Sequence, residues 1–310
     1  MAIPIIVIGS SNTDMVVKTE KLPMPGETVM GGTFLMNPGG KGANQAVSAA
    51  RLGSKVIFIA KVGDDLFGRQ ALQQFQHENI DTSFITMDRD HPSGVALIGV
   101  DAHGENSIIV APGSNSYLNT QIVEQALESI REPAIILIQL EIPIQTVEFA
   151  IERGYAKGCK VILNPAPVRS LDKKALQYLH LITPNESEAE MLTGIRVTDL
   201  LTAEQAALQL HKLGVPNVVI TLGARGAYLH TKSITKLIPA PPVTAVDTTA
   251  AGDCFSGALA VALSEGFEIE KAVSFACNAA SISVTRMGAQ SSLPYRKEVN
   301  EISLHSLNNS

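Results

Sequence analysis

Residues 134–163 have the sequence AIILIQLEIPIQTVEFAIERGYAKGCKVIL, and this stretch decides the fold class. The apolar run at 134–138 is uninterrupted, which is typical of a strand that is covered on both faces. Apolar side chains then recur with helical spacing over 144–155, and a second apolar run follows at 161–163. A strand, a helix and a strand in this order predict a right-handed unit with two parallel strands.

The same alternation extends in both directions along the chain. Further apolar runs lie at 5–8, 56–60, 181–182 and 218–220, and apolar residues with helical spacing lie between several of them, as at 206–213. This pattern predicts an α/β fold with a doubly wound, mainly parallel sheet flanked by helices. Since neither a linker nor a repeat interrupts it, the chain is expected to form one domain over residues 1–310.

Two stretches, 14–36 and 93–110, depart from this alternation. They contain β-type segments at 15–17, 28–29, 94–100 and 107–110, with turn residues at 23–26 and 101–104 and no helix between them. They predict a small separate β-sheet. From periodicity alone this sheet is a pair of surface hairpins, a lid or a dimer surface.

Composition excludes several classes of function. The 24 Lys and Arg residues and 30 Asp and Glu residues give a net charge of −6, and no basic cluster is present, so a nucleic-acid partner is not expected. The three cysteines form no C-x-x-C pair, which disfavours both a disulfide framework and a zinc site. The apolar runs are too short to span a membrane, and no basic residue precedes Lys18 as a secretory signal would require. A cytoplasmic protein is therefore expected.

Polar residues follow six of the apolar runs. In open parallel sheets, ligands bind beyond the carboxyl ends of the strands. The pattern therefore predicts a polar crevice, suited to hydroxylated or phosphorylated ligands, along one edge of the sheet. The residues are Asn12, Asp14, Asp64, Asp65, Gln139, Glu141, Asn164, Asn185, Glu188, Thr221 and the turn 223–226.

Two glycine-rich segments precede helices. Residues 37–44, NPGGKGAN, match neither a Walker A loop nor the dinucleotide-binding G-x-G-x-x-G pattern. Glycines permit close approach of a ligand to the backbone, and Lys41 and Asn44 are candidates to bind hydroxyl groups. The alternative is an ordinary tight turn before a helix.

The second segment is 247–253, DTTAAGD. Its small residues leave the N–H groups of a helix N-terminus free to face an anion. Asp253 would lie in the first helical turn, where a carboxylate either stabilises the helix terminus or orients and deprotonates a hydroxyl group.

Together these segments resemble the two signatures of the PfkB carbohydrate kinases. Residues 39–46 and 247–253 carry the signatures, residues 185–188 (NESE) are similar to the family's N-x-x-E motif, and the resemblance covers essentially the whole chain. The segments 9–14, 164–167 and 285–290 resemble the ribose-phosphorylating members. The resemblance implies ATP-dependent phosphorylation of D-ribose at O5 to D-ribose 5-phosphate by in-line transfer.

The resemblance also implies roles for individual residues. Asp253 would be the general base, with an anion hole at Ala250, Ala251 and Gly252. The sugar would contact Asn12, Thr13, Asp14, Gly40, Lys41, Gly42, Ala43, Asn44, Glu141 and Asp253. ATP would contact Asn185, Thr221, Leu222, Gly223, Ala224, Arg225, Gly226, Gly252, Asp253, Cys277 and Asn278.

The family further implies two cations and a dimer. Glu188 would place Mg²⁺, or another divalent cation, through water. An activating monovalent ion, usually K⁺, would lie near Asp247, Thr249, Ser283, Arg286, Gly288 and Ser292. The insertions at about 14–36 and 93–110 would form a β-sheet lid that closes over the sugar and joins two copies as a homodimer.

Several alternatives stay open at this point. A sister kinase would act on deoxyribose, fructose or a nucleoside, although Asn12 favours a sugar with a 2-hydroxyl group because deoxyribose kinases tend to have an apolar residue there. A nicotinamide-dependent oxidoreductase would need a glycine fingerprint that residues 9–12 lack. A non-catalytic sugar sensor is the third alternative. Cys254 is expected to be a small packing residue, and the histidines, such as His77, His91 and His103, are expected at the surface.

Overall fold

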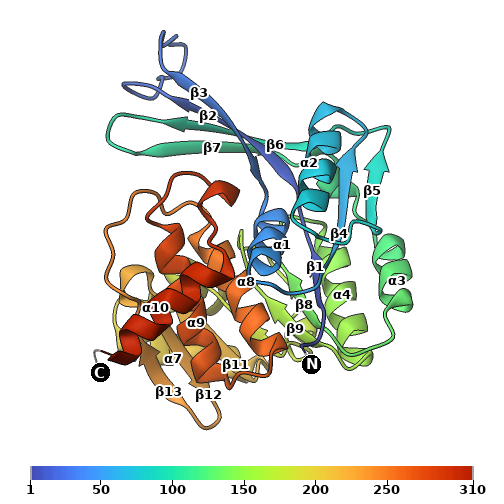
Figure 1. Ribbon diagram of the computed structural model, residues 1–310, viewed down its shortest axis with the longest axis vertical. Helices are drawn as coiled ribbons and strands as arrows, with labels where there is room; N and C mark the ends of the chain where they lie inside the picture. Colours follow the sequence, from blue (N-terminus) through green and yellow to red (C-terminus); the bar gives the residue numbers. More distant parts are fainter. Residues whose placement is uncertain (1, 309–310) are drawn as a thin grey trace.

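The computed structural model describes residues 2–308 (Figure 1). In this part of the chain the main sheet has nine strands in the order β13-β12-β11-β10-β9-β8-β1-β4-β5. The strands from β5 to β11 run parallel, and β12 and β13 are antiparallel to their neighbours. Their bounds are Ile5–Ile8 (β1), Val56–Gly63 (β4), Ile85–Asp88 (β5), Ile135–Ile138 (β8), Lys160–Leu163 (β9), Leu181–Ile182 (β10), Asn217–Thr221 (β11), Ala227–Thr231 (β12) and Thr235–Ile238 (β13).

Helices cover both faces of this sheet. Alternate side chains of β1 show the two layers: Ile5 and Val7 pack in one core with α1, α8 and α9, whereas Ile6 and Ile8 pack in the other with α3, α4 and α7. The α-helices are Lys41–Arg51 (α1), Leu66–His77 (α2), Thr120–Ser129 (α3), Ile144–Ala156 (α4), Lys173–Leu176 (α5), Glu186–Thr193 (α6), Leu200–Lys212 (α7), Ala251–Ser264 (α8), Ile269–Ser283 (α9) and Arg296–Asn308 (α10). Short 3-10 helices occupy Gly113–Tyr117 (η1), Gly223–Arg225 (η2) and Gln290–Ser292 (η3).

The fold class predicted from the sequence is confirmed. Each of the six apolar runs lies on a strand, namely β1, β4, β8, β9, β10 and β11, and all four residues of β1 are completely buried. Burial of each such side chain contributes roughly 1.5–3 kcal/mol to stability. A strand that is covered on both faces is therefore apolar at every position, and this is the pattern that the runs show. The hairpin β12–β13, with the strand sequences AYLHT and TKLI, was not predicted. Among the described residues, no helix is long and apolar enough to cross a lipid bilayer.

A second, smaller sheet projects from the main body at the top of Figure 1. It has the order β3-β2-β6-β7, with bounds Asn12–Lys18 (β2), Thr33–Gly39 (β3), Gly94–Val100 (β6) and Asn106–Ala111 (β7). A separate sheet built from the two predicted insertions is therefore present. We refer to these four strands as the small sheet.

One strand of the small sheet was predicted at the wrong place. Residues 28–29 are not in a strand, and the chain pairs with β2 only from Thr33 onward. Gly31 and Gly32, with φ of +93° and +115°, have a backbone conformation that a β-strand does not adopt, so the strand begins after them. The predicted turns are present: the N–H of Glu27 donates to the carbonyl of Met24, and that of Gly104 to the carbonyl of Asp101.

Helices α1 and α8 pack closely against each other below the small sheet. A Cβ atom added to Gly257 of α8 would lie 2.7 Å from Cβ of Ser48 and 2.9 Å from the carbonyl oxygen of Gln45, both on α1. The Ser48 hydroxyl donates to the carbonyl of Cys254 across the same contact, at 3.2 Å. This close approach places the first turn of α8 next to the first turns of α1.

Candidate active site

Asp253 lies in the first turn of α8 and is 5% exposed. The residue before the helix, Ala250, has φ 59°, a left-handed conformation that costs a non-glycine residue roughly 1–2 kcal/mol. Such strain is typical of functional segments. The N–H of Ala251 donates to the carbonyl of Thr248 at 3.2 Å, whereas the N–H of Gly252 has no acceptor within the described chain. Of the residues predicted for the anion hole, Gly252 therefore has a free N–H group, whereas the N–H group of Ala251 is engaged in the turn that begins at Thr248.

Amide side chains of α1 bind both carboxylate oxygens of Asp253. Nδ2 of Asn44 donates to Oδ2, and Nε2 of Gln45 donates to Oδ1, each at 2.9 Å. The two glycine-rich segments, about 200 residues apart in sequence, therefore meet at this carboxylate. No role for Gln45 followed from the sequence, because nothing in its local pattern indicates this contact.

Acidic side chains surround Lys41, the first residue of α1. The charge of Asp253 raises the pKa of the Lys41 ammonium most, and burial opposes this rise. The carboxylates of Glu141, Glu188 and Asp14 raise it further. Four carboxylates around one ammonium give a formal charge of −3, so a neutral polyol fits this region, whereas a polyphosphate requires an accompanying cation.

Asp14 has the most perturbed carboxylate in this group. Its pKa is raised from 3.8 to about 6, mainly by burial and further by the charges of Glu141 and Asp253, while Lys41 opposes the rise. Asp14 pairs with Asn37 of β3, and Gly39 lies two residues further along that strand; a Cβ atom added to Gly39 would lie 2.2 Å from the Asp14 carboxylate, so the glycine provides the space that this side chain occupies. A carboxyl group close to its titration point at neutral pH is typical of a binding or catalytic site.

The loop after β1 packs against the start of α1. Gly40 has φ 90°, and a Cβ atom there would lie 2.7 Å from the backbone nitrogen of Asn12. A Cβ atom on Gly42 would lie 2.5 Å from the nitrogen of Ser10. Glu141 joins the two segments, because its Oε2 accepts from the Ser10 hydroxyl at 2.5 Å and from the N–H of Lys41 at 3.0 Å.

Not every residue predicted to contact sugar faces this region. Asn12 and Asp14 lie on one face of β2, and Thr13 lies on the opposite face; Thr13 and Asn12 both border a separate cavity of about 260 Å³. The methyl group of Ala43 is buried in the core, and its N–H donates to the carbonyl of Ser10. Asp64 and Asp65 are also outside the site: Asp64 pairs with Arg69, and Asp65 accepts from the N–H groups of Gly68 and Ser93.

Asn115 is a further residue that the sequence did not single out. Its Nδ2 donates to Oδ1 of Asn12 at 2.8 Å and to the carbonyl of Ser11 at 3.0 Å, and its Oδ1 accepts from the N–H of Ser11 at 2.9 Å. It is buried within η1, about 100 residues from the loop that it binds. Asn115 therefore fixes the orientation of the Asn12 amide.

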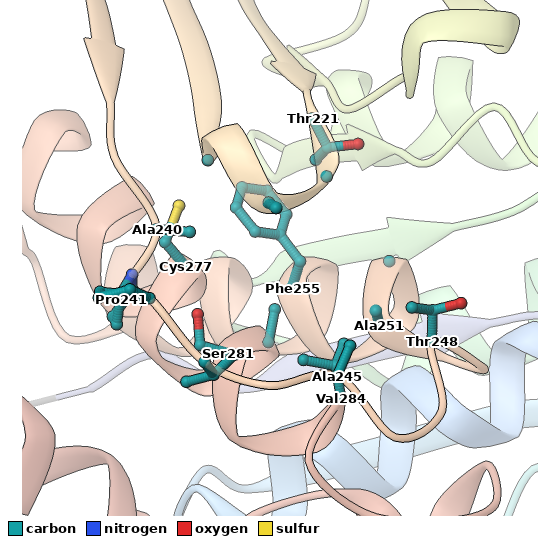
Figure 2. Close-up of a pocket in the computed structure, with 17 residues that line it drawn as sticks. Thr221, Ala240, Pro241, Ala245, Thr248, Ala251, Phe255, Cys277, Ser281 and Val284 are labelled. Atoms are coloured by element: carbon teal, nitrogen blue, oxygen red, sulfur yellow. The ribbon is translucent and has the colours of Figure 1, made fainter.

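Two adjoining cavities lie beside Asp253. The larger has a volume of about 480 Å³ and a mainly apolar lining, and Figure 2 shows Phe255, Cys277 and Pro241 around it. The smaller, of about 200 Å³, is lined by Lys41, Glu188 and Asp253. Both cavities are bordered by Thr221, Thr248, Ala251 and Gly252. The two cavities together accommodate a ligand with a flat apolar group in the larger cavity and a phosphate chain that extends into the smaller one.

The predicted nucleotide residues divide into two groups. Thr221, Gly223, Ala224, Gly226, Gly252 and Cys277 line the larger cavity. Leu222, Arg225 and Asn278 do not line it, and Arg225 pairs instead with Glu186 on α6. Ala280 and Ser281, one turn beyond Cys277 on α9, line it in addition. Burial raises the pKa of the Cys277 thiol to about 12, so this cysteine contributes an apolar surface rather than a thiolate.

Asn185 and Glu188 form a capping box at the start of α6. Asn185 Oδ1 accepts from the N–H of Glu188, and Glu188 Oε2 accepts from the N–H of Asn185, each at 2.8 Å. Both residues also line the smaller cavity. Burial raises the pKa of Glu188. Since the capping box uses one oxygen of the carboxylate, Oε1 remains to bind a hydrated divalent cation, whose preferred ligands are oxygen atoms.

Asp247 joins the loop before α8 to the loop after α9. Its Oδ1 accepts from the N–H of Thr249 at 2.9 Å, and its Oδ2 from the N–H of Gly288 at 2.8 Å. Burial alone would raise the pKa of Asp247, but these hydrogen bonds outweigh it and the pKa lies below its ordinary value. Ser283, the last residue of α9, and Ser292, in η3, are buried, and the Arg286 side chain pairs with Glu298. The Asp247 carboxylate and the Ser283 and Ser292 hydroxyl groups are oxygen donors of the kind that a hard cation prefers.

The expectation that the histidines lie at the surface was wrong for His230. It is 8% exposed, and its Nδ1 lies 2.7 Å from Nε2 of His211, a contact between β12 and α7. Cys254 is completely buried with a pKa raised by burial to about 12, in agreement with a packing role.

Comparison with known proteins agrees with this geometry. Residues 3–296 match the model of the pfkB family carbohydrate kinases. The chain is 44% identical over 299 residues to the ribokinase of Haemophilus influenzae, covering 96% of this chain and 98% of that protein. It is 39% identical over 298 residues to the deoxyribokinase of Salmonella typhi, covering 96% and 97%. The crystal structure of the ribokinase from Thermotoga maritima matches with a TM-score of 0.90 and 41% identity, covering 97% of this chain and 99% of that one.

The chain belongs to the pfkB family of carbohydrate kinases. It is an ATP-dependent carbohydrate kinase, and bacterial ribokinases and deoxyribokinases are among its relatives. The family resemblance carried by residues 39–46 and 247–253 is thereby confirmed. Membership also removes the oxidoreductase alternative.

Proposed function

We propose that this enzyme phosphorylates D-ribose at O5, with Asp253 as the general base. The observation that carries the proposal is the position of Asp253. It borders the smaller cavity, which fits a phosphate chain, and it is hydrogen-bonded to Asn44 in the segment proposed to bind sugar. A carboxylate between these two regions is in reach of both reactants.

The proposed reaction is a single in-line displacement. O5 of ribose attacks the γ-phosphorus of ATP, the bond from that phosphorus to the β,γ-bridging oxygen breaks, and Asp253 accepts the proton from O5. ADP leaves with the bond electrons. Because the transition state is loose, Asp253 mainly orients the hydroxyl group, and N–H groups at the start of α8 stabilise charge on the transferred phosphoryl group. Gly252 has a free N–H for this purpose, while that of Ala251 must first leave the carbonyl of Thr248.

Two cations are proposed to complete the site. Glu188 would bind a hydrated Mg²⁺ or another divalent ion next to Asn185, which would contact ATP, and the ion would neutralise phosphate charge in a region whose own charge is negative. Asp247, Thr249, Ser283, Arg286, Gly288 and Ser292 would surround K⁺. Because Asp247 connects the loop that precedes the anion hole to the loop at Gly288, an ion there would order the N–H donors.

A coupled assay of ADP release tests the proposal. The expected result is turnover with ribose that requires a divalent cation and increases with K⁺. Asp253→Asn should reduce kcat by at least a factor of 10³, while ATP binding, measured by calorimetry, and the melting temperature change little. Near-normal turnover by this variant would remove Asp253 from the role of base.

Phosphorylation of 2-deoxyribose is the second candidate, favoured by the 39% identity to a deoxyribokinase. Asn12 distinguishes the two, since its Oδ1 already accepts from Asn115 and its Nδ2 would be left unpaired by a sugar without a 2-hydroxyl group. A buried polar group without its partner costs about 1–3 kcal/mol, so kcat/KM is expected to be higher for ribose by about 10-fold or more. Equal values for the two sugars would favour a broader specificity.

We infer that the small sheet acts as a lid of a single-domain enzyme and joins two copies. Met36, Leu97 and Ile109 lie in one cross-strand row and are 46%, 50% and 67% exposed. Exposed apolar rows of this kind mark interaction surfaces, and closure over the sugar would exclude water as a competing acceptor. Ile109→Lys is expected to convert a dimer to a monomer in light scattering. A monomeric parent protein would contradict the inference.

A further inference from the structure

We propose that Gln45 is the residue that positions the Asp253 carboxylate for catalysis, and that Gln139 in turn orients Gln45. The proposal rests on the proposed role of Asp253 as the base. Gln45 is a positioning residue in the strict sense, because its side chain contacts the carboxylate and reaches neither reactant. Its side chain is completely buried, and it lines neither of the two cavities beside Asp253.

The contacts of Gln45 define one orientation of its amide. Nε2 donates to Oδ1 of Asp253 at 2.9 Å and to Oδ1 of Asn164 at 3.0 Å. Oε1 accepts from Nε2 of Gln139 at 2.5 Å. Rotating the amide by half a turn would set its oxygen against two acceptors and its nitrogen against a donor, so the flipped state is excluded electrostatically.

The neighbouring amides are oriented as well. Nδ2 of Asn164 donates to the carbonyl of Thr183 at 3.2 Å, which leaves its Oδ1 to face Gln45. Gln139 is completely buried and Asn164 is 6% exposed. Oε1 of Gln139 and Oδ1 of Asn44 have no hydrogen-bond partner among the described residues, so loss of the Gln45 hydrogen bonds would add further unpaired groups to a buried network.

The network determines which lone pairs of Asp253 remain available. Each carboxylate oxygen accepts about two hydrogen bonds. With Asn44 on Oδ2 and Gln45 on Oδ1, the carboxylate plane is fixed, and the remaining lone pairs face the cavity side. Loss of the Gln45 donor would permit the carboxylate to rotate away from the sugar hydroxyl without removing any contact to the sugar.

The first test is Gln45→Met, which retains the length of the side chain and removes its polar atoms. We expect kcat for ribose to fall by a factor on the order of 10², because small misplacement of a catalytic group has effects of this size. KM for ribose and for ATP should change by less than about twofold, since Gln45 contacts neither. An unchanged kcat, or a loss that appears only in KM, would overturn the proposal.

Gln45→Glu provides a readout that a merely structural residue would not give. In its protonated form the new side chain can donate to Asp253 and accept from Gln139, as glutamine does. In its ionised form it places a negative charge beside Asp253. The ratio of its kcat to that of the parent enzyme should therefore rise as the pH falls, by up to about tenfold per pH unit above the pKa of the new carboxyl group. A ratio that is independent of pH would overturn the proposal even if the variant is less stable.

Ser48→Ala is the matched control. Ser48 lies one turn further along α1, is equally buried and contacts α8 at Cys254 rather than at Asp253. Ser48→Ala should lower the melting temperature slightly and leave kcat unchanged. A loss of kcat as large as that of Gln45→Met would show that general packing of α1 on α8, and not the Gln45 donor, is responsible.

Asp253→Asn, measured alongside, separates the proposed base from the proposed positioning residue. If it retains turnover, the proposed base is wrong; if it is inactive while Gln45→Met is fully active, only the positioning role is wrong.

Discussion

Replacing Asp14 by asparagine should make this enzyme more stable at neutral pH and weaken its binding of ribose. Asp14 is mostly buried on β2, and burial raises the pKa of its carboxyl group from 3.8 to about 6, with further contributions from the charges of Glu141 and Asp253. Its ionised form is therefore disfavoured in the folded protein. An enzyme that retains such a group exchanges stability for a binding function.

The sign and size of the effect follow from linkage. The pKa of Asp14 is higher in the folded state than in the unfolded state, so the folded protein binds more protons between these two values. The free energy of unfolding consequently falls as the pH rises through this window. A shift of about 2 units corresponds to about 3 kcal/mol of stability lost at neutral pH. Asparagine recovers most of this, which for a domain of this size raises the melting temperature by about 4 °C.

Thermal unfolding at two pH values tests this reasoning. At about pH 7.5, Asp14→Asn should melt at a higher temperature than the parent, and below about pH 4 the difference should vanish because the parent carboxyl group is then protonated. Calorimetric titration with ribose at neutral pH should show a loss of affinity of about 10-fold or more, as expected for a lost hydrogen bond to a charged group. Glu152→Gln, which removes one exposed carboxylate from α4, is the control for net charge.

Two results would refute the argument. A gain in melting temperature of the same size at both pH values would show that ionisation of Asp14 is not its cause. Unchanged affinity for ribose would remove Asp14 from the sugar site.

Two further substitutions test contacts that hold the site together. Asn115→Ala removes the hydrogen bond that orients the Asn12 amide. KM should rise about 10-fold for ribose and much less for 2-deoxyribose. An equal rise for both sugars would contradict a role of Asn12 in binding the 2-hydroxyl group. Gly257→Val places side-chain atoms within 2.7 Å of Ser48, so α1 and α8 must separate. Urea unfolding should show a loss of about 1–3 kcal/mol, and kcat should fall because Gln45 and Asp253 face each other across the same contact. Unchanged stability would show that the helices are not limited by this glycine.

The sequence by itself determined the layered sheet. A parallel strand such as β8 is buried on both faces, so its apolar run is visible without knowledge of its neighbours. The glycine-rich starts of α1 and α8 were visible for a related reason, because backbone conformations such as that of Gly40 restrict the residue type locally. Strand β3 shows the limit of this reasoning, because the apolar pattern at residues 28–29 did not reveal that the strand begins only after Gly31 and Gly32.

Only the tertiary structure decided how the site is assembled. The contacts of Gln45 with Asp253 and of Asn115 with Asn12 join residues separated by 208 and 103 positions, and no local pattern encodes them. The same is true of the raised pKa of Asp14 and of the burial of His230 against His211. Periodicity reflects which side of an element is buried. Hydrogen-bond partners and local charge instead depend on which distant elements pack together, and that is settled by the fold as a whole.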